Sequence, residues 1–485
     1  MKTIMKRRIS KVLTAFMLCV CMLFSAACGG GGNNGENWWT NEGELTKDEN
    51  GNVVFDNVEF KLSTIVNGED KAAFNTLVTK FNRLYDGKIN VIVTNIPAES
   101  FETTISKQIT NKSNPPDLIM SHQKANRNFA DNRLIQPFDE IMEASGIVID
   151  LDNYAEGLAQ YSSAGYEDVT YAIPVDAQSF VVFYNKKLLA KYADSVPADR
   201  ESLTAVLKAF KADSTNNGKA PIGWSTGGDY FSEYVFLTAI LQNGGEFYNK
   251  DDYRAEWVDD ETNFAAFNSA IQSFRELINN GYANYGEADN KVLSEFMAGE
   301  RLFYFTTPWT MEAMVENYAK QLGVSSERLM DEYLGGASMS GWFAMSDNPA
   351  KNSIYGDSHF FSMSRSVADV NKKAAICEFV RWFTEDSSAG AEWGRAGHIS
   401  ASNKITEAED YQNNPYVSNY IYKFYPNIDD FHSIGATPYY EAIISNLSGI
   451  FTDTVGNTKN PSAESDKASI KQRQEAVNAQ IDFFA

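Results

Sequence analysis

Apolar and polar positions along the chain follow two periods. Short apolar runs at residues 58–66 and 88–95 fit strands, whereas residues 70–85 carry apolar side chains at helical spacing. Further helical periods occur at 101–110, 203–212, 232–242, 263–279, 367–384 and 468–484, and further strands at 117–120, 171–184 and 301–305. This alternation favours a mostly parallel sheet covered by helices. A length of 485 residues predicts two or three lobes.

The first 27 residues have the pattern of an export signal. Five basic residues and no acidic residue accompany an apolar run at 12–24, which is too short to favour a permanent membrane span. Small residues (Ser25-Ala26-Ala27) lead to Cys28, as in a lipobox, although Ser25 stands where bacterial lipoproteins usually have Leu. We predict a signal peptide at 1–27 and a lipidated Cys28. The alternative is an ordinary cleaved signal that happens to be followed by a cysteine.

Residues 28–55 are polar and rich in Gly and Asn, so they predict a flexible tether behind the lipidated cysteine. Loss of the leader removes five positive charges and changes the formal net charge from −22 to −27. The mature chain then has two cysteines, Cys28 and Cys377. Cys377 lies in an apolar helical pattern. We expect it to be a buried, unreactive thiol.

Composition excludes several classes of protein. The chain has 64 acidic against 42 basic residues, and a surface of that sign repels nucleic acid. Four Cys and four His argue against a disulfide scaffold or a Cys/His zinc module. Because no two histidines have the spacing of ligands on one helix, we expect no metal and no cofactor.

Aromatic residues are numerous, with eight Trp and 24 Tyr. Several of them follow predicted strands, where ligands bind in open α/β sheets. Their rings offer a flat apolar face and a polar edge, which suits sugar rings. Each ring taken singly is more often part of a core.

Four segments, in order, resemble extracellular solute-binding proteins of the maltose-binding type, which serve ABC importers. The resemblance covers about residues 58–405. The segments are Pro116–Met120 with 129–135, Tyr171–Lys186, Gly228–Gly245 and Phe303–Trp309. Of these, Tyr171–Lys186 is the most specific.

The resemblance implies an α/β, two-lobed periplasmic-binding-protein-like fold (type II), with discontinuous lobes joined by hinge strands. We expect the chain to cross between lobes near 171–178, 304–309 and 364–367. The expected division is 56–172 plus 308–366 for lobe 1 and 173–307 plus 367–485 for lobe 2. A ligand would bind in the cleft, and the lobes would close around it.

Ligand contacts are expected on rings that stack and on polar groups that hold hydroxyls. The resemblance places Trp309, Tyr230, Asp229, Asp176 and His398 at or beside the cleft. The full expected set is Asn67, Asp70, Ser121, His122, Gln123, Asp176, Gln178, Trp224, Asp229, Tyr230, Trp309, His359 and His398. Ser121, His122 and Gln123 belong to it because they follow a strand that is expected to end at Met120.

Each of these residues also has a structural interpretation. Trp309 would be a packed hinge residue and Trp224 a core residue. Asp70 and Asp229 would cap helices. Asp176 would be a solvated acid in a turn.

The favoured function is the binding of a carbohydrate without catalysis. An oligosaccharide is the favoured ligand. Expected partners are ABC permease subunits and, through the lipid, the outer face of the cytoplasmic membrane. We expect a monomer that binds no nucleic acid. A secreted glycoside hydrolase, which needs two carboxylates across one bond, is an alternative. A surface glycan-binding adhesin is another.

Overall fold

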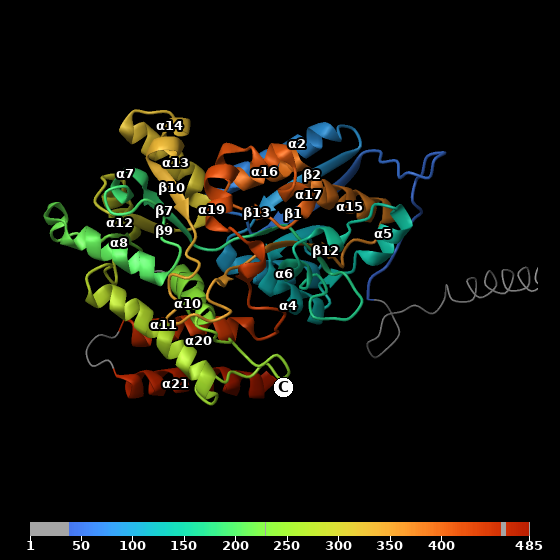
Figure 1. The fold of residues 1–485 in the computed structure, drawn as a ribbon. Coiled ribbons are helices and arrows are strands. Elements are labelled where there is room, and N and C mark those ends of the chain that lie inside the picture. Colours follow the sequence, from blue (N-terminus) through green and yellow to red (C-terminus); the bar gives the residue numbers. More distant parts are fainter. Residues whose placement is uncertain (1–37, 228, 457–461, 485) are drawn as a thin grey trace, which may run out of the picture.

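The computed structural model describes residues 38–227, 229–456 and 462–484. The predicted signal peptide, Cys28 and the first part of the predicted tether lie outside these residues. The described chain forms two α/β halves, each built on its own sheet (Figure 1). The sheet that begins with β1 lies on the right of Figure 1, and the sheet that contains β7 lies on the left.

The first half contains a six-stranded sheet in the order β2-β1-β3-β12-β4, with β5 paired to β12. β1 runs parallel to β2 and β3, whereas β12 is antiparallel to all three of its partners. The strands are β1 (Val58–Thr64), β2 (Ile89–Asn95), β3 (Leu118–His122), β4 (Ile135–Gln136), β5 (Ala172–Pro174) and β12 (His359–Ser364).

Helices of the first half pack on this sheet through apolar faces. α2 buries Phe74, Leu77 and Phe81 one helical turn apart, and α15 packs Phe379 against Phe60 of β1. The helices are α2 (Lys71–Leu84), α3 (Phe101–Thr110), α4 (Asn126–Asp131), α5 (Asp139–Ser145), α6 (Glu156–Ala159), α15 (Val370–Glu385), α16 (Ser387–Arg395), α17 (Asn403–Thr406) and α18 (Glu409–Gln412).

The second half contains a four-stranded sheet in the order β10-β7-β9-β8. β7 is antiparallel to β9 and β10, and β8 is parallel to β9. Its strands are β7 (Val181–Asn185), β8 (Ile222–Gly223), β9 (Phe303–Thr306) and β10 (Leu334–Ala337). Its helices are α7 (Lys186–Leu189), α8 (Arg200–Ala212), α9 (Asp229–Phe231), the π-helical turn η5 (Ser232–Phe236), α10 (Leu237–Gln242), α11 (Glu261–Asn279), α12 (Asp289–Met297), α13 (Met311–Leu322), α14 (Ser326–Glu332), α19 (Tyr422–Phe424), α20 (Tyr440–Thr454) and α21 (Ala463–Phe484).

Short strands join the two halves. The chain leaves the first sheet at β5, forms β6 (Asp176–Ala177) and enters the second sheet at β7, as expected for the first crossing. β6 pairs with β13 (Ile399–Ser400), and β11 (Ile354–Tyr355) pairs with β14 (Phe431–His432). These pairs bring hinge segments together that lie far apart in the sequence.

β10 and α15 do not lie in the halves to which the sequence assigned them. β10 belongs to the second sheet, although 308–366 was assigned to lobe 1, and α15 packs on β1, although 367–485 was assigned to lobe 2. The chain does not change sheets at 304–309 or at 364–367, because β9 and β10 share the partner β7 and because α15 follows β12 on the same sheet. The second change of sheet lies between β10 and β12.

The sheets are of mixed type, so the expectation of a mostly parallel sheet was wrong. β12 re-enters the first sheet after a long excursion through the second half and runs opposite to β3. Because the chain enters β12 from the opposite end of the sheet, β12 pairs antiparallel with β3. Strand–helix alternation predicts parallel neighbours only where each strand returns to the same sheet.

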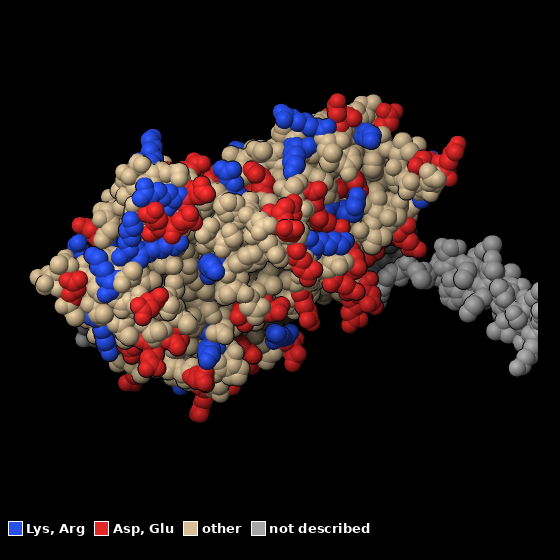
Figure 2. Space-filling model, turned by 45° about the horizontal axis from the view of Figure 1, so that its top comes forward, with Lys and Arg blue, Asp and Glu red and all other residues tan. Residues whose placement is uncertain are grey.

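The surface shows no segregation of charge on the face drawn in Figure 2. Acidic and basic side chains lie interspersed over that face of the described chain (Figure 2). The visible face therefore has no continuous basic strip of the kind that follows a phosphate backbone. None of the helices in the described residues has the length and apolar character that a membrane span requires.

Cys377 should be unreactive in the folded protein. It is buried on α15, and burial together with the neighbouring Glu378 raises the pKa of its thiol. We expect a disulfide reagent such as DTNB to leave the mature chain carrying Cys28→Ser unlabelled at pH 8, because the thiolate is the reacting species. One thiol should react once the chain is unfolded in guanidinium. Rapid labelling under native conditions would contradict the burial of this thiol.

Candidate functional site

Loops from both halves meet beside an aromatic pair. Trp309 lies in the short helix η6 (Pro308–Thr310) directly after β9, and Tyr230 lies in α9, after β8. The two rings are 6.0 Å apart between centroids, edge to face at 80°. Tyr230 is 48% exposed, and Trp309 is partly buried, so the pair presents aromatic surface at the boundary between the halves.

The loop after β1 reaches this pair from the first half. A Cβ placed on Gly68 would lie 3.4 Å from Cδ1 of Trp309 and 3.1 Å from Oδ1 of Asp70. The backbone of Gly68 therefore lies close to both a carboxylate oxygen of its own half and an indole edge of the other half. Asp70 Oδ1 is buried and has no hydrogen-bond partner among the described residues. Asn67, one residue before Gly68, is exposed.

Gly397 brings a third segment to the same place. Its φ of +103° is in the region that favours glycine, and a Cβ there would lie 2.1 Å from the carbonyl oxygen of Pro308. Any larger residue would push the segment away from η6. This close approach of Gly397 to Pro308 fixes the position of the next residue, His398.

A buried carboxylate lies at the centre of the hinge. Asp176 of β6 is completely buried. It accepts hydrogen bonds from the backbone N–H of His359 (2.9 Å), from Nδ1 of His359 (2.9 Å to Oδ2) and from the indole N–H of Trp393 (2.7 Å). The interpretation of Asp176 as a solvated turn acid was therefore wrong. One side chain links β6, β12 and α16.

His398 completes this network from the segment before β13. Its Nδ1 lies 3.3 Å from Oδ2 of Asp176 but lacks hydrogen-bond geometry, and this nitrogen has no other partner among the described residues. Its Nε2 lies 3.1 Å from Oδ2 of Asp70. The ring stacks on Trp393 with centroids 4.1 Å apart and planes at 4°. Asp70 thus holds a histidine; its side chain makes no capping bond to α2.

A second polar cluster lies beside the one around Asp176, where the ring of His122 is 5.1 Å from that of His359. His122 Nδ1 is 3.4 Å from Oδ2 of Asp357, and Lys124 Nζ is 3.8 Å from the same oxygen. Lys124 also donates to Oε1 of Glu233 at 3.1 Å. Lys124 follows β3 in the first half, and Glu233 lies in η5 of the second half. This ion pair therefore connects the two halves directly.

Burial and neighbouring charge set the protonation of these groups. Burial would raise the pKa of Asp176, but the two imidazoles and the hydrogen bonds from His359 outweigh it and hold the pKa at about 2. Burial would lower the pKa of His359, but Asp176 raises it above its usual value. Burial raises the pKa of Asp357 to about 6 despite Lys124. Burial and His359 keep the pKa of His122 well below its usual value.

The other residues expected to contact ligand have different surroundings. Ser121 and His122 lie within β3, which extends to His122 and does not end at Met120, because both residues pair with β12. Gln123 is buried and accepts a hydrogen bond from Ser433 (3.1 Å). Gln178 is buried, and its Oε1 has no partner among the described residues.

Trp224 lies in the core of the second half. Its ring is fully buried against Phe231, Phe274 and Phe305, and its indole N–H donates to the carbonyl of Asn284 at 2.8 Å. These surroundings agree with the interpretation of Trp224 as a core residue. The side chain of Asp229 lies outside what the structure describes.

Four residues of the site were not among those expected: Lys124, Glu233, Asp357 and Trp393. Lys124 and Asp357 each lie within two residues of an expected site residue, so a wider window along the chain includes them. Glu233 and Trp393 lie inside helical segments and carry no local signal of a binding role. Only the pairing of the two halves brings Glu233 to Lys124.

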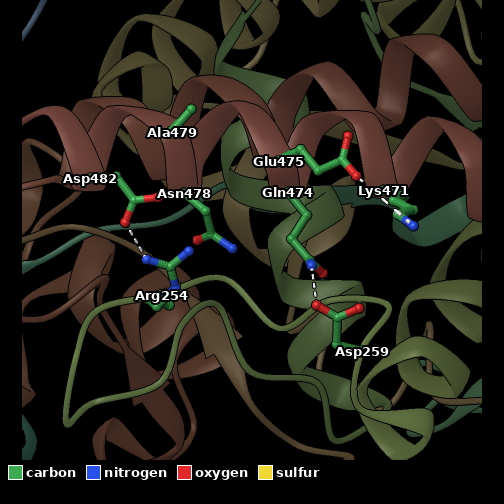
Figure 3. A pocket seen from close by; sticks show the side chains of 8 residues that line it. All are labelled: Arg254, Asp259, Lys471, Gln474, Glu475, Asn478, Ala479 and Asp482. Carbon is green, nitrogen blue, oxygen red and sulfur yellow. Dashed lines mark hydrogen bonds and ion pairs between the residues drawn. The ribbon is translucent and has the colours of Figure 1, made fainter.

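A shallow polar pocket lies elsewhere, between α21 and the loop before α11 (Figure 3). Gln474 donates to Asp259 at 2.6 Å, and Arg254 pairs with Asp482 at 2.5 Å. Asn478 exchanges two hydrogen bonds with the backbone of Ala255. These contacts dock α21 on the second half, and the pocket shares no residue with the interlobe site.

The Lys124–Glu233 pair is expected to stabilise the contact between the halves. Glu233→Gln leaves the mostly buried Lys124 ammonium with only the more distant Asp357, so we expect a loss of about 1.5–3 kcal/mol in the free energy of unfolding. The measurement is urea denaturation followed by circular dichroism.

The matched control is Glu332→Gln, which breaks exposed pairs with Arg328 on α14 and with Lys187. An exposed pair of this kind is worth under about 1 kcal/mol. Equal small losses for both variants would show that Lys124–Glu233 contributes no more than a surface pair.

Solved structures share this architecture. The sugar-binding protein MalE of Xanthomonas citri matches with a TM-score of 0.70 at 16% identity, over 88% of this chain and 99% of MalE. The GacH receptor of Streptomyces glaucescens, solved unliganded and with acarbose, matches with a TM-score of 0.63 at 17% identity, over 87% of this chain and 98% of its own. UgpB of Mycobacterium tuberculosis, solved with glycerophosphocholine, has a TM-score of 0.63 at 13% identity, over 87% of this chain and 99% of UgpB.

These likenesses show the two-lobed fold of periplasmic binding proteins. The comparison with curated proteins found no match. The sequence of residues 76–419, well over half of the chain, matches the family described as bacterial extracellular solute-binding protein. The protein therefore belongs to the bacterial extracellular solute-binding proteins, which function outside the cytoplasm.

Proposed function

We propose that this protein is the carbohydrate receptor of an ABC importer and that it binds an oligosaccharide between its two lobes without altering it. The observation that carries the proposal is the meeting of Trp309 and Tyr230 with the Asn67–Asp70 loop across the lobe boundary. MalE and GacH, which share the fold, are a sugar-binding protein and an acarbose receptor.

The chemistry of this place suits a sugar. The edge-to-face pair of Trp309 and Tyr230 presents apolar ring surface, on which the C–H face of a pyranose stacks. Beside it, Oδ1 of Asp70 has no hydrogen-bond partner among the described residues and is ready to accept from a hydroxyl. The exposed Asn67 supplies an amide donor and acceptor at the rim.

Binding would depend on the position of one lobe against the other. Asp70 and Gly68 belong to the first half, whereas Trp309 and Tyr230 belong to the second, so a solute that touches both favours the closed arrangement. The Lys124–Glu233 pair forms across the same boundary. In this arrangement the permease subunits of the importer would receive the closed, loaded form.

Anchoring is the second part of the proposal. We infer that Cys28 carries a lipid on the outer face of the cytoplasmic membrane and that the polar segment behind it is the tether. The basic and apolar leader and the small residues before Cys28 support it. A tethered receptor stays close to its importer, which raises its local concentration there.

Trp309→Ala should weaken carbohydrate binding and leave the fold intact. Removal of one stacking ring is expected to cost about 1–3 kcal/mol of binding free energy, roughly 5- to 150-fold in Kd. A panel of oligosaccharides is first screened by thermal shift, because a bound ligand stabilises the folded state. The best ligand is then titrated by calorimetry into both proteins.

Two controls separate binding from packing. Tyr166→Ala removes another exposed ring, one that lies at a tilt against Tyr171 away from the site, and should not change the Kd. Trp224→Ala removes a core ring and should lower the melting temperature strongly. A Trp309→Ala protein that melts early but binds normally would show that Trp309 is a packing residue, and product release from any glycan would reject binding without catalysis.

Cys28→Ser should release the protein from the membrane. Without its thiol the chain has no site for the thioether of a lipid, so we expect the variant in the soluble fraction and the parent protein in the detergent phase of Triton X-114. Mass spectrometry of the N-terminal peptide checks the modification. A Cys28→Ser protein that still partitions into detergent would contradict lipidation at this residue.

A further inference from the structure

We propose that Asp176, His359 and His398 form a binding site for one divalent transition-metal ion, of which zinc is the representative, inside the hinge. Each of the three residues offers a ligand atom, and these atoms all lie within 4.8 Å of one another. The three side chains come from β6, the start of β12 and the segment before β13, and all are buried.

The spacing of the donors fits an ion of this kind. Tetrahedral coordination with bonds of about 2.0–2.1 Å places ligand atoms roughly 3.3 Å apart. His398 Nδ1 lies 3.3 Å from Oδ2 of Asp176, and His359 Nδ1 lies 2.9 Å from the same oxygen. Two imidazoles and one carboxylate are donors that zinc and its neighbours in the first transition row accept.

His398 carries the argument furthest. Its Nδ1 is buried, faces Asp176 and makes no hydrogen bond to any described residue. Its other nitrogen, Nε2, is held by Oδ2 of Asp70 at 3.1 Å. A carboxylate on the far nitrogen is the usual second-sphere partner of a metal-binding histidine, because it fixes the tautomer that directs the free nitrogen at the ion. Stacking on Trp393 fixes the plane of the ring.

The charge of the surroundings supports a dication. Asp70, Asp176, Asp357 and Glu233 are each at most 9% exposed. They lie in two groups of contacts that meet where the rings of His122 and His359 are 5.1 Å apart. Lys124 is the only lysine or arginine that contacts either group in the described chain. Buried carboxylates need compensating positive charge. An ion coordinated by Asp176 and two neutral imidazoles supplies it, and a proton on Nδ1 of His359 would leave to solvent as the ion binds.

A metal at this position would act on the hinge. It would join β6, β12 and the segment that carries Gly397, which packs on Pro308 beside Trp309. The fourth coordination position would be taken by water. None of the three proposed metal ligands is a proposed carbohydrate contact, although Asp70 touches both His398 and the loop beside Trp309. The test of the metal site does not require a solute.

The test uses the mature protein with Cys28→Ser, stripped with dipicolinate and titrated with Zn²⁺ by calorimetry and with Co²⁺ by visible absorption. We expect one equivalent of each ion, cobalt d–d bands of tetrahedral intensity, and a higher melting temperature with zinc. His359→Gln and His398→Gln should abolish the bands. His432→Gln, which changes an exposed histidine outside the cluster, should keep them.

Asp70→Asn supplies a second, milder variant in case the histidine variants do not fold. It retains all three ligands and removes only the charge that orients His398, so we expect one equivalent with an affinity lowered by about 10- to 100-fold. The proposal is overturned if the stripped parent protein binds neither ion. It is also overturned if binding is unchanged in Asp70→Asn and in whichever histidine variants fold.

Discussion

The carboxylate of Asp176 is the interaction on which the hinge segment between β5 and β7 depends, because it fixes that segment to β12 and α16 of the first half. Three segments that are separated by up to 222 positions in the sequence, β6, β12 and the stretch around His398, meet at this one side chain. An unpaired buried carboxylate would be costly, so each of its partners has to be in place in the folded protein. The backbone N–H of His359 and the indole of Trp393 provide neutral donors, and Nδ1 of His359 provides a further hydrogen bond. The hinge is therefore defined by electrostatics as much as by strand pairing.

Polar contacts extend from this centre to both sides of the interface. On one side, Asp70 connects His398 to the loop beside Trp309. On the other side, His122, Asp357 and Lys124 lead to Glu233 in the second half. Apolar cores behind these contacts keep each sheet rigid, so relative movement of the halves has to break or remake polar contacts at the boundary. Rigid halves with a polar boundary suit a hinge-bending receptor.

The sequence predicted the elements that depend on local pattern. The helical period around Phe74 and Phe81 gave α2, and the apolar surroundings of Cys377 gave a buried position on α15. The family resemblance gave the two-lobed fold and the loops beside Trp309. Lobe assignments after residue 308 failed for β10 and α15, because strand direction depends on which sheet a segment returns to, and hydrophobic period does not carry that information. The same limit concealed the hinge cluster. His359 and His398 lie 39 positions apart, without helical ligand spacing, and they reach Asp176 only through the pairing of β12 with β5 and of β13 with β6.

Asp70 connects the two parts of the site, because its two oxygens face different neighbours. Oδ2 binds His398, which belongs to the hinge cluster, while Oδ1 lies against Gly68 next to Trp309. The two oxygens share one negative charge. A solute hydroxyl that donates to Oδ1 would draw charge away from Oδ2, which holds His398, and a positive charge near His398 would draw charge away from Oδ1 in the same way. Such coupling needs no movement of the backbone, and linkage makes it reciprocal: whatever strengthens one contact of Asp70 alters the affinity at the other by the same factor. The physical warrant is a single shared carboxylate in a water-poor environment, where electrostatic interactions are stronger than at the surface. In the proposed function, one acid would therefore serve both the solute surface and the hinge.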